Sequence, residues 1–222
     1  MAGCGPTEGA SQGASQNRAG SVEASGKLDA RAQALLAAAD KGRIQGDTTA
    51  TIWLVEVSDF QCPFCKMWHD STYAAIQREF IKPGLVRMAY VNYPLQQHAN
   101  AKPAAEAAMC AAAQGKFWPM HSRIFAAQKR WSDMADPAAV FDSLAAASGV
   151  RQTEWRECIA STTMRLLIAT DQDYGVKAGV RSTPSFYIGS EALSGAAPIE
   201  AFRAAIARER AKAAPRARPA TP

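Results

Sequence analysis

The chain contains two kinds of apolar pattern: short continuous runs, and longer stretches in which apolar residues recur every three or four positions. Residues 51–57 and 85–92 are runs of the first kind and are short enough to predict buried strands. The second pattern predicts helices over residues 28–39, 63–80, 101–113, 117–128, 137–149, 154–160, 164–177 and 198–208. Residues 186–188 and 191–193 are expected to form a short hairpin. The pattern indicates an α/β protein in which a long helical region follows the second strand.

Cys62, Pro63, Phe64 and Cys65 form a C-x-x-C motif between the first predicted strand and the helix that follows it. The unpaired N–H groups and the positive dipole end at the start of a helix stabilise a thiolate on the first cysteine. The spacing lets the second sulfur attack a mixed disulfide formed by the first. We therefore predict a redox site in which Cys62 is the exposed, reactive thiol and Cys65 is its buried partner.

The same two cysteines could instead be soft ligands for zinc or Cu(I). A structural zinc site normally needs a second pair of ligands at similar spacing. Cys110, Cys158, His69, His98 and His121 stand singly in the sequence. We therefore favour the redox site and predict no metal and no cofactor beyond the cysteine pair. We expect His98 and His121 to be surface residues or hydrogen-bonded helix residues.

Three segments carry a family resemblance: residues 58–65 (SDFQCPFC), residues 114–118 (QGKFW) at the end of an Ala-rich stretch, and residues 180–184 (VRSTP). In these segments the chain resembles the DsbA-like family of extracytoplasmic disulfide oxidoreductases. The resemblance covers roughly residues 49–208. It implies a thioredoxin fold with an all-helical domain inserted between the second and third core strands.

The resemblance also suggests how the chain is divided. We predict a flexible N-terminal linker or tether at residues 1–26 and a thioredoxin-like domain formed by residues 27–94 and 179–210. The inserted helical domain is expected at residues 95–178, and a disordered basic tail at residues 211–222.

The resemblance further implies roles for residues around the motif. Pro184 is expected to be cis and to lie beside Cys62 and Cys65, although a trans proline stays open from the sequence alone. Pro184 and Thr183 would hold the substrate backbone against the site, where an extended chain can pair with the free edge. Pro63 and Phe64 would contact substrate, and this dipeptide resembles the oxidising members of the family more than thioredoxin.

Glu56 interrupts the apolar run before the motif, six residues ahead of Cys62. A carboxylate in a buried strand is costly unless it is paired, hydrated or protonated. The DsbA-like family carries a buried acid at this position, which implies that Glu56 accepts a proton from Cys65. The alternative is a glutamate at the edge of a strand that reaches solvent.

Cys110 and Cys158 both fall in the predicted helical insertion. As buried free thiols they would be small hydrophobic residues. Some DsbA-like proteins carry a second, structural disulfide in the helical domain, so the resemblance favours a disulfide between them. Such a bridge would be structural rather than a second active site.

Cys4 follows Met-Ala-Gly and precedes a segment rich in Gly, Ser, Ala and Gln, a composition typical of a flexible linker. Small residues before a cysteine and a polar tether after it are similar to the end of a bacterial lipoprotein signal. We therefore expect Cys4 to be a lipid attachment site. The alternative is a free thiol in a disordered segment.

Composition and charge narrow the choice of partners. The chain of 222 residues is 48% hydrophobic, enough for one substantial core. The formal net charge is +5, but the last fifteen residues contain five basic side chains and one glutamate, so much of the excess lies in the tail. No aromatic-studded basic surface accompanies it, and we do not expect nucleic-acid binding. A membrane would be contacted only through the lipid anchor.

The resemblance implies a thiol–disulfide oxidoreductase, with oxidation favoured, that acts on thiols of exported or unfolded proteins outside the cytoplasm. A membrane or soluble redox partner would reset it. No extra dimerisation domain is visible, so we predict a monomer. A reductase or isomerase with the same site, a Cu(I)- or zinc-binding module, and a fold that has lost its chemistry remain alternatives.

Overall fold

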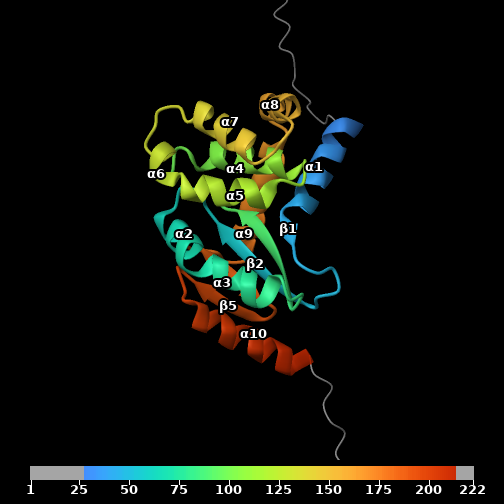
Figure 1. Ribbon diagram of the computed structural model, residues 1–222, viewed down its shortest axis with the longest axis vertical. Helices are drawn as coiled ribbons and strands as arrows, with labels where there is room; N and C mark the ends of the chain where they lie inside the picture. Colours follow the sequence, from blue (N-terminus) through green and yellow to red (C-terminus); the bar gives the residue numbers. More distant parts are fainter. Residues whose placement is uncertain (1–27, 214–222) are drawn as a thin grey trace, which may run out of the picture.

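A five-stranded sheet forms the centre of the computed structural model, which describes residues 28–213 (Figure 1). The strands are β1 (Ile44–Gln45), β2 (Ile52–Ser58), β3 (Val86–Asn92), β4 (Ser185–Ile188) and β5 (Glu191–Ser194). They lie in the order β1-β3-β2-β4-β5. β2 and β3 are parallel and the other neighbouring pairs are antiparallel. β2 is therefore the central strand, with hydrogen-bonded neighbours on both sides.

Helices surround this sheet and form a separate layer above it. Helix α1 (Ala30–Gly42) precedes the sheet. The helix after β2 is continuous and consists of α2 (Pro63–Trp68), the π-helical turn η1 (His69–Tyr73), α3 (Ala74–Ile76) and a second π-helical turn η2 (Gln77–Ile81). The inserted helices are α4 (Ala101–Ala112), α5 (Phe117–Ala126), α6 (Gln128–Trp131), α7 (Ala138–Ala147), α8 (Gln152–Ser161) and α9 (Met164–Lys177). α10 (Ile199–Ala213) follows β5, below the sheet in Figure 1. None of the described helices combines the length and apolar character needed to span a bilayer.

The predicted α/β fold with a helical insertion is confirmed. The insertion lies between β3 and β4 because the structure contains one strand that was not predicted. That strand, β1, pairs antiparallel with β3 through Ile44 and Gln45. A strand of two residues is too short to produce a periodic pattern in the sequence.

The C-terminal helix is longer than predicted. It continues to Ala213, so a disordered tail starting at residue 211 is wrong for residues 211–213. Its last turns are joined to the β4–β5 hairpin: Arg208 and Lys212 form ion pairs with Glu191, at 2.7 and 3.6 Å. The rest of the predicted tail, and the predicted linker with Cys4, lie outside the described residues.

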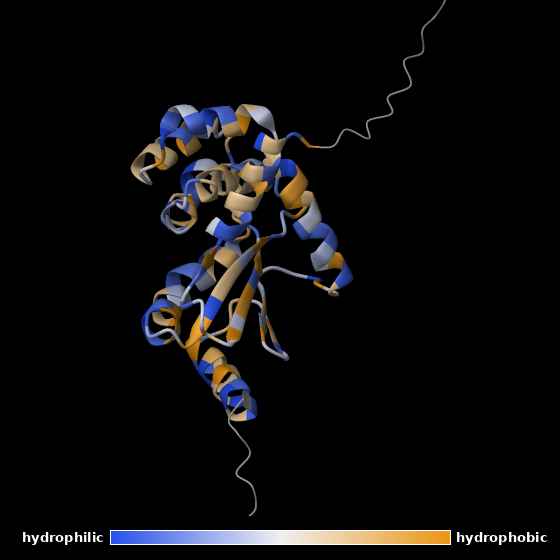
Figure 2. Ribbon diagram, turned by 90° about the vertical axis from the view of Figure 1, so that its right-hand side faces the viewer, coloured by the Kyte–Doolittle hydropathy of each residue, from blue (hydrophilic) through white to orange (hydrophobic). Residues whose placement is uncertain are grey.

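Two hydrophobic clusters meet at the sheet. One lies between β2, β4, the helix after β2, and α10, and is centred on Leu54, Trp68, Phe186 and Phe202. The other fills the helical insertion and reaches Cys62 and Cys65. Figure 2 shows hydrophobic residues along the central strands and hydrophilic residues on the outer turns of the helices. The motif cysteines therefore lie where the two clusters adjoin.

Cys110 of α4 and Cys158 of α8 form a disulfide, with a sequence separation of 48 residues. Both residues are buried in the helical cluster. Because the bridge joins two inserted helices, it restricts the unfolded chain without involving the sheet. The chain-entropy model gives an upper value of about 4 kcal/mol for a loop of this length.

We expect the double substitution Cys110→Ala and Cys158→Ala to lower the free energy of unfolding by about 2–4 kcal/mol, because it restores freedom to the unfolded chain and leaves a small cavity. Thermal and urea unfolding measure this loss. The reactivity of Cys62 towards a thiol reagent should stay unchanged, because Cys62 is held by other contacts. A large change in that reactivity without a change in stability would contradict a structural role for the disulfide.

Candidate active site

The C-x-x-C motif lies where the central strand ends and a helix begins. β2 ends at Ser58, and Cys62 is the N-cap residue of α2, with Pro63 in the first helical position. Proline is favoured there because the missing N–H would have no partner inside the helix. The backbone N–H groups of the first turn therefore point towards the Cys62 side chain, as the sequence predicted.

Cys62 is buried, which corrects the expectation of an exposed thiol: only 3% of the residue is accessible. Its Sγ lies 3.4 Å from the backbone oxygen of Thr183, to which the thiol form donates, so the loop before β4 covers it. Gln128 of α6 covers it from the insertion, donating through Nε2 to the backbone oxygens of Phe60 at 2.7 Å and Cys62 at 3.1 Å. Periodicity could not reveal either contact, because both come from segments distant in the sequence.

The two thiols have opposite acidities. A hydrogen bond from Cys65, assisted by the side chain of Thr183 and by the N–H groups of Phe64 and Cys65, lowers the pKa of Cys62 to about 6 despite its burial. Burial raises the pKa of Cys65 well above that of a free thiol, and the neighbouring Cys62 raises it further. At neutral pH the pair therefore holds one thiolate, on Cys62, and one thiol, on Cys65.

Pro184 lies at the start of β4, and the Thr183–Pro184 peptide bond is cis. The backbone oxygen of Pro184 accepts a hydrogen bond from Gly195 at 2.8 Å, which joins the loop to the end of β5. Thr183 and Pro184 are both buried, whereas Pro63 and Phe64 face solvent, with Phe64 56% exposed.

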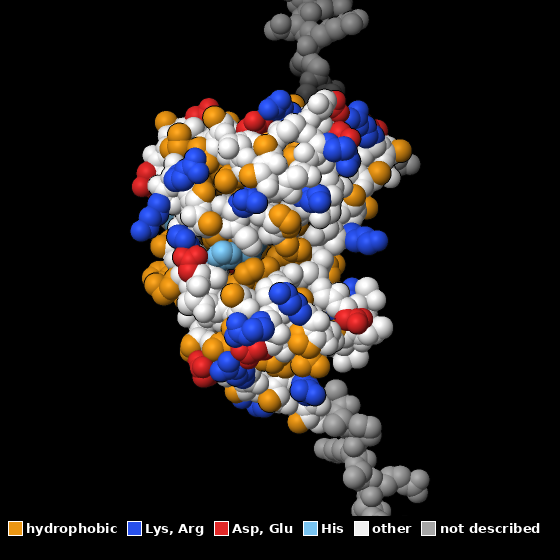
Figure 3. Space-filling model, viewed as in Figure 1, with side chains coloured by type: hydrophobic (Ala, Val, Ile, Leu, Met, Phe, Trp, Pro, Cys, Tyr) orange, Lys and Arg blue, Asp and Glu red, His pale blue; other side chains and the backbone are white. Residues whose placement is uncertain are grey.

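Hydrophobic side chains reach the surface close to the motif. Met67, one turn after Phe64 on α2, is 54% exposed. Figure 3 shows hydrophobic side chains along the boundary between the helical layer and the lower part of the molecule, with charges of both signs around them. An apolar protein segment could therefore be accommodated beside the cysteines.

Glu56 is fully buried in the central strand, so it is not a strand-edge residue that reaches solvent. Its neighbours across the sheet are Tyr90 and Phe186. Neither carboxylate oxygen has a hydrogen-bond partner among the described residues. Burial raises the pKa of Glu56 to about 8, with the nearby Ser58 hydroxyl acting in the opposite direction. Ser58 lies next along the same face of β2 and also lowers the pKa of Cys65, so it stands between the carboxyl and the buried thiol.

A buried hydrogen-bond network holds the loop between β2 and α2. Asp59 accepts from the backbone N–H groups of Gln61 at 2.7 Å and Leu95 at 2.8 Å, and its Oδ2 lies 2.7 Å from Nδ1 of His98. Its own N–H donates to Sγ of Cys65 at 3.5 Å. His98 is thus hydrogen-bonded, as expected, but it lies in the loop before α4 rather than in a helix. Asp59 was part of the family motif in the sequence, but its contacts were not predicted.

His121 departs from the expectation. It is fully buried and neither ring nitrogen has a hydrogen-bond partner among the described residues. Burial, followed by the neighbouring His69, lowers the pKa of His121 well below its usual value. No sequence pattern signals this environment, because His121 stands singly on an amphipathic helix.

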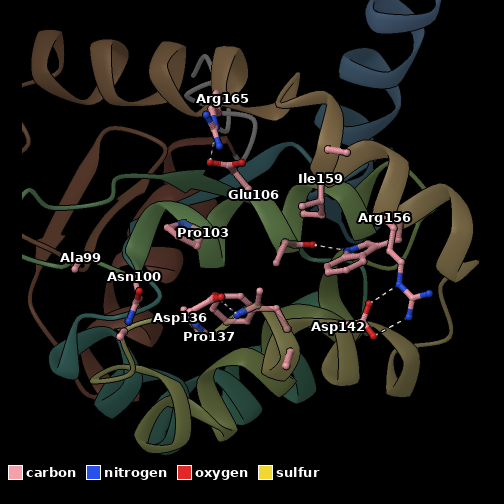
Figure 4. Close-up of a pocket in the computed structure, with 17 residues that line it drawn as sticks. Ala99, Asn100, Pro103, Glu106, Asp136, Pro137, Asp142, Arg156, Ile159 and Arg165 are labelled. Atoms are coloured by element: carbon pink, nitrogen blue, oxygen red, sulfur yellow. Dashed lines mark hydrogen bonds and ion pairs between the residues drawn. The ribbon is translucent and has the colours of Figure 1, made fainter.

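Within residues 28–213 no group of three or more His, Cys, Asp or Glu side chains is arranged to hold a metal ion. A cavity of about 890 Å³ lies instead in the helical insertion, walled by Phe141, Trp155 and Ile159 (Figure 4). Ion pairs between Arg165 and Glu106, at 2.9 Å, and between Arg156 and Asp142, at 2.7 Å, flank it. No cysteine lines this cavity.

Comparison with known proteins agrees with this geometry. Disulfide bond formation protein D of Bacillus subtilis is 23% identical over 172 residues, which cover 75% of this chain and 76% of that protein. The Na(+)/H(+) antiporter NhaA 3 of Salinispora tropica is 32% identical over 170 residues, but the chain spans only 24% of that antiporter.

Solved structures show the same fold. The crystal structure of oxidised BdbD from Bacillus subtilis gives a TM-score of 0.69 at 24% identity, covering 76% of this chain and 93% of that one. Chlamydia trachomatis DsbA gives a TM-score of 0.69 at 18% identity, covering 78% and 93% of the two chains. A family model described as Thioredoxin matches residues 38–208. The chain therefore belongs to the thioredoxin family, and the predicted resemblance to its DsbA-like members is confirmed.

Proposed function

We propose that this protein is a thiol–disulfide oxidoreductase that oxidises thiol pairs in exported proteins. The opposite acidities of Cys62 and Cys65 carry this proposal. A thiol with a pKa of about 6 is ionised at neutral pH and is a good leaving group, as an oxidant requires. The buried Cys65 thiol takes part in the intramolecular step, in which the bond between the two cysteines forms or breaks.

The reaction uses the disulfide form of the pair. A substrate thiolate attacks Sγ of Cys62, and the bond between the two sulfurs breaks as Cys65 leaves with the electron pair and takes up a proton. A second substrate thiolate then attacks the substrate sulfur of the mixed disulfide, and Cys62 leaves as a thiolate. Two electrons pass to the enzyme, the substrate gains a disulfide, and one of its two protons ends on Cys65.

The acidity of Cys62 favours the oxidising direction. Its pKa is lower in the folded dithiol form than the unperturbed value of 9.0, so the ionised group stabilises the folded reduced state. This stabilisation is complete above pH 9 and is lost as the pH falls through about 6. The disulfide form contains no thiolate and therefore does not gain this stabilisation. The reduced form is therefore favoured at neutral pH, which makes the disulfide form an oxidant.

Thr183, Pro184, Pro63 and Phe64 are proposed to bind the substrate. The backbone of Thr183 already contacts Sγ of Cys62, so a substrate strand paired with this loop would bring its own sulfur to the same place. Exposed Phe64 and Met67 offer apolar contact without dictating a sequence. Such a surface suits unfolded chains of varied sequence.

Glu56 is proposed to exchange a proton with Cys65, directly or through Ser58. With a pKa of about 8 its carboxyl is mostly protonated at neutral pH. It can therefore donate a proton to the Cys65 thiolate as that sulfur leaves, and accept one when the disulfide forms again.

A reductase or isomerase would use the same residues, and the equilibrium with glutathione separates these functions. The reduction potentials of thioredoxin-fold cysteine pairs range from about −270 mV for a thioredoxin to about −120 mV for a strong oxidant. We expect the potential of this pair in the oxidising half of that range. A potential near the thioredoxin value would instead favour the reductase.

We expect Cys65→Ser to accumulate mixed disulfides with reduced, unfolded protein substrates, because the resolving thiol is gone while Cys62 stays reactive. Non-reducing electrophoresis and mass spectrometry measure them. Cys62→Ser is the matched control and should trap none. Wild-type protein should oxidise a reduced dithiol peptide, whereas a wild type that neither oxidises the peptide nor forms mixed disulfides would refute the proposal and leave a fold without redox chemistry.

We expect Glu56→Gln to make stability less sensitive to pH. A carboxyl whose folded pKa lies near 8, above its unperturbed 4.5, stabilises the folded state fully only below pH 4.5 and progressively loses that contribution as pH rises through 8. The variant should therefore match wild type near pH 5 and exceed it by about 2–4 kcal/mol near pH 8, at about 1.4 kcal/mol for each pKa unit.

Urea unfolding of the reduced proteins at the two pH values measures this difference. Glu157→Gln, at a carboxylate exposed on α8, is the control and should change stability by less than about 1 kcal/mol at both pH values. A Glu56→Gln effect of equal size at both pH values would contradict the buried, protonated carboxyl.

The proposed site of action is outside the cytoplasm, with attachment through an acylated Cys4. If this is correct, Cys4→Ser expressed from the complete gene will move the protein from the membrane fraction to the soluble extracytoplasmic fraction. Wild type recovered with an unmodified Cys4 thiol would rule out the anchor.

A further inference from the structure

Several buried polar atoms near Glu56 have no hydrogen-bond partner among the described residues. They are the two oxygens of Glu56, the hydroxyls of Ser58 and Tyr90, both ring nitrogens of His121, and Nε2 of His69. We call these five side chains the buried polar cluster. An unpaired buried polar group commonly costs about 1–3 kcal/mol, so a whole cluster of them calls for a functional explanation.

The members of the cluster lie next to one another. Tyr90 is the β3 neighbour of Glu56 in the sheet register. The ring of His121 lies 5.3 Å from that of Tyr90 and 5.4 Å from that of His69, both edge-on. Helix α5, which carries His121, lies directly above α2 and α3 in Figure 1. The cluster therefore crosses from the central strand to the interface between α5 and the helix after β2.

His69 connects this cluster with solvent. Its Nδ1 lies 3.2 Å from Oδ1 of Asp70, whose side chain is 51% exposed. A cavity of about 710 Å³ that opens to solvent is lined by His69, Asp70, Tyr73, Gln77, Lys82 and Ser122. Nδ1 of His69 therefore faces the surface, whereas its Nε2 is buried and has no hydrogen-bond partner among the described residues.

We propose that His121 and His69 form a proton relay that connects Glu56, and through it Cys65, with solvent at Asp70. This inference rests on the proposed function, because only a redox cycle requires a proton to enter and leave the interior. His121 and His69 do not touch the reacting sulfurs, and they act through Glu56.

The proton balance of the proposed reaction requires such a route. When Cys65 leaves as a thiolate, Glu56 donates its proton and becomes a carboxylate in an apolar site. By way of Tyr90, the neighbour of both, His121 then passes a proton to the carboxylate and takes one from His69. His69 is reprotonated from water in the cavity beside Asp70, because the lowered pKa of Asp70 keeps that group a carboxylate. When the disulfide forms again, the same proton leaves by the reverse route. A neutral imidazole suits this task because one nitrogen donates while the other accepts.

The surroundings offer few competing groups. The titratable or charged side chains around the two histidines are Tyr90 from β3, Tyr73, Asp70 and Lys66 from the helix after β2, and Lys82, which lines the same cavity as His69. Glu56 borders this group through Tyr90 and Tyr73. Burial raises the pKa of Tyr73 and of Tyr90 well above the usual tyrosine value, so neither ionises near neutral pH. The phenol of Tyr73 accepts from Gln45 and Gln77 and is already engaged. The remaining walls are aromatic, including Phe125, whose ring is 5.0 Å from both histidines.

The test separates two steps of the reaction of the reduced protein with oxidised glutathione. Attack by the Cys62 thiolate forms a mixed disulfide and needs no proton from the interior. Attack by Cys65 on that mixed disulfide requires Cys65 to lose its proton. Acid quenching followed by mass spectrometry follows both steps over a range of pH.

We expect His121→Ala to leave the rate of the first step within about twofold of wild type. The rate of the second step should fall by about tenfold or more, which is less than the full contribution of a general acid or base, about 10²–10⁴-fold. Added imidazole should restore the second step by entering the space left by the side chain, and His69→Phe should slow it without leaving such a space. Phe125→Leu is the packing control: it should lower the melting temperature and leave both rates near wild type.

The outcomes distinguish the two proposals. A folded His121→Ala or His69→Phe variant that resolves the mixed disulfide at the wild-type rate would overturn the relay, as would equal slowing by Phe125→Leu. Slowing of both steps together would also overturn it and assign His121 a packing role. Failure of wild type to form any mixed disulfide would refute the redox function itself.

Discussion

The burial of Cys65 beside Cys62 is the constraint on which the active site depends. A thiol removed from water resists ionisation, and it donates a hydrogen bond that makes its neighbour more acidic. One apolar environment thereby produces two thiols of opposite character. The helix start adds N–H groups from Phe64 and Cys65 on the Cys62 side only, and this asymmetry separates the attacked sulfur from the resolving one.

The helical insertion maintains that burial. Gln128 reaches from α6 to the backbone oxygens of Phe60, before the motif, and of Cys62, its first residue. The Asn100 side chain donates to the backbone oxygens of Trp131, Ser132 and Met134, and its backbone N–H donates to the side chain of Gln61. These bonds connect the α6 region with the loop before Cys62. The insertion therefore covers the active site. A disulfide joins two of its helices to each other, and amide side chains attach it to the loop before the motif.

Sequence patterns predicted the elements that local spacing controls. The strand before the motif, its helix, the hairpin and the inserted helices other than the short α6 follow from periodicity, turn residues and one family motif. The buried state of Cys62 did not, because it arises from Thr183 and Gln128, distant in sequence. Contacts with segments distant in sequence also explain β1, whose two residues form a strand only because they pair with the edge of β3. They explain the burial of His121 as well, because its neighbours come from β3 and from two helices. Spacing predicts which residues share a face of an element, whereas tertiary packing decides what that face meets.

Proton movement and electron movement make opposing demands on this interior. Thiol chemistry here requires an apolar site, because water around Cys65 would remove the difference in acidity between the two sulfurs. A dry site, however, cannot exchange the proton that each cycle moves on and off Cys65. In the proposed reaction Glu56 reduces this conflict, because its carboxyl, with a pKa of about 8, holds the proton in neutral form near pH 7. The carboxyl must nevertheless be reset in every cycle, and a chain of neutral polar side chains does so without introducing a permanent charge. The proposed relay accounts for the unpaired atoms of the buried polar cluster, since groups fully engaged in hydrogen bonds could not change partners as the proton passes.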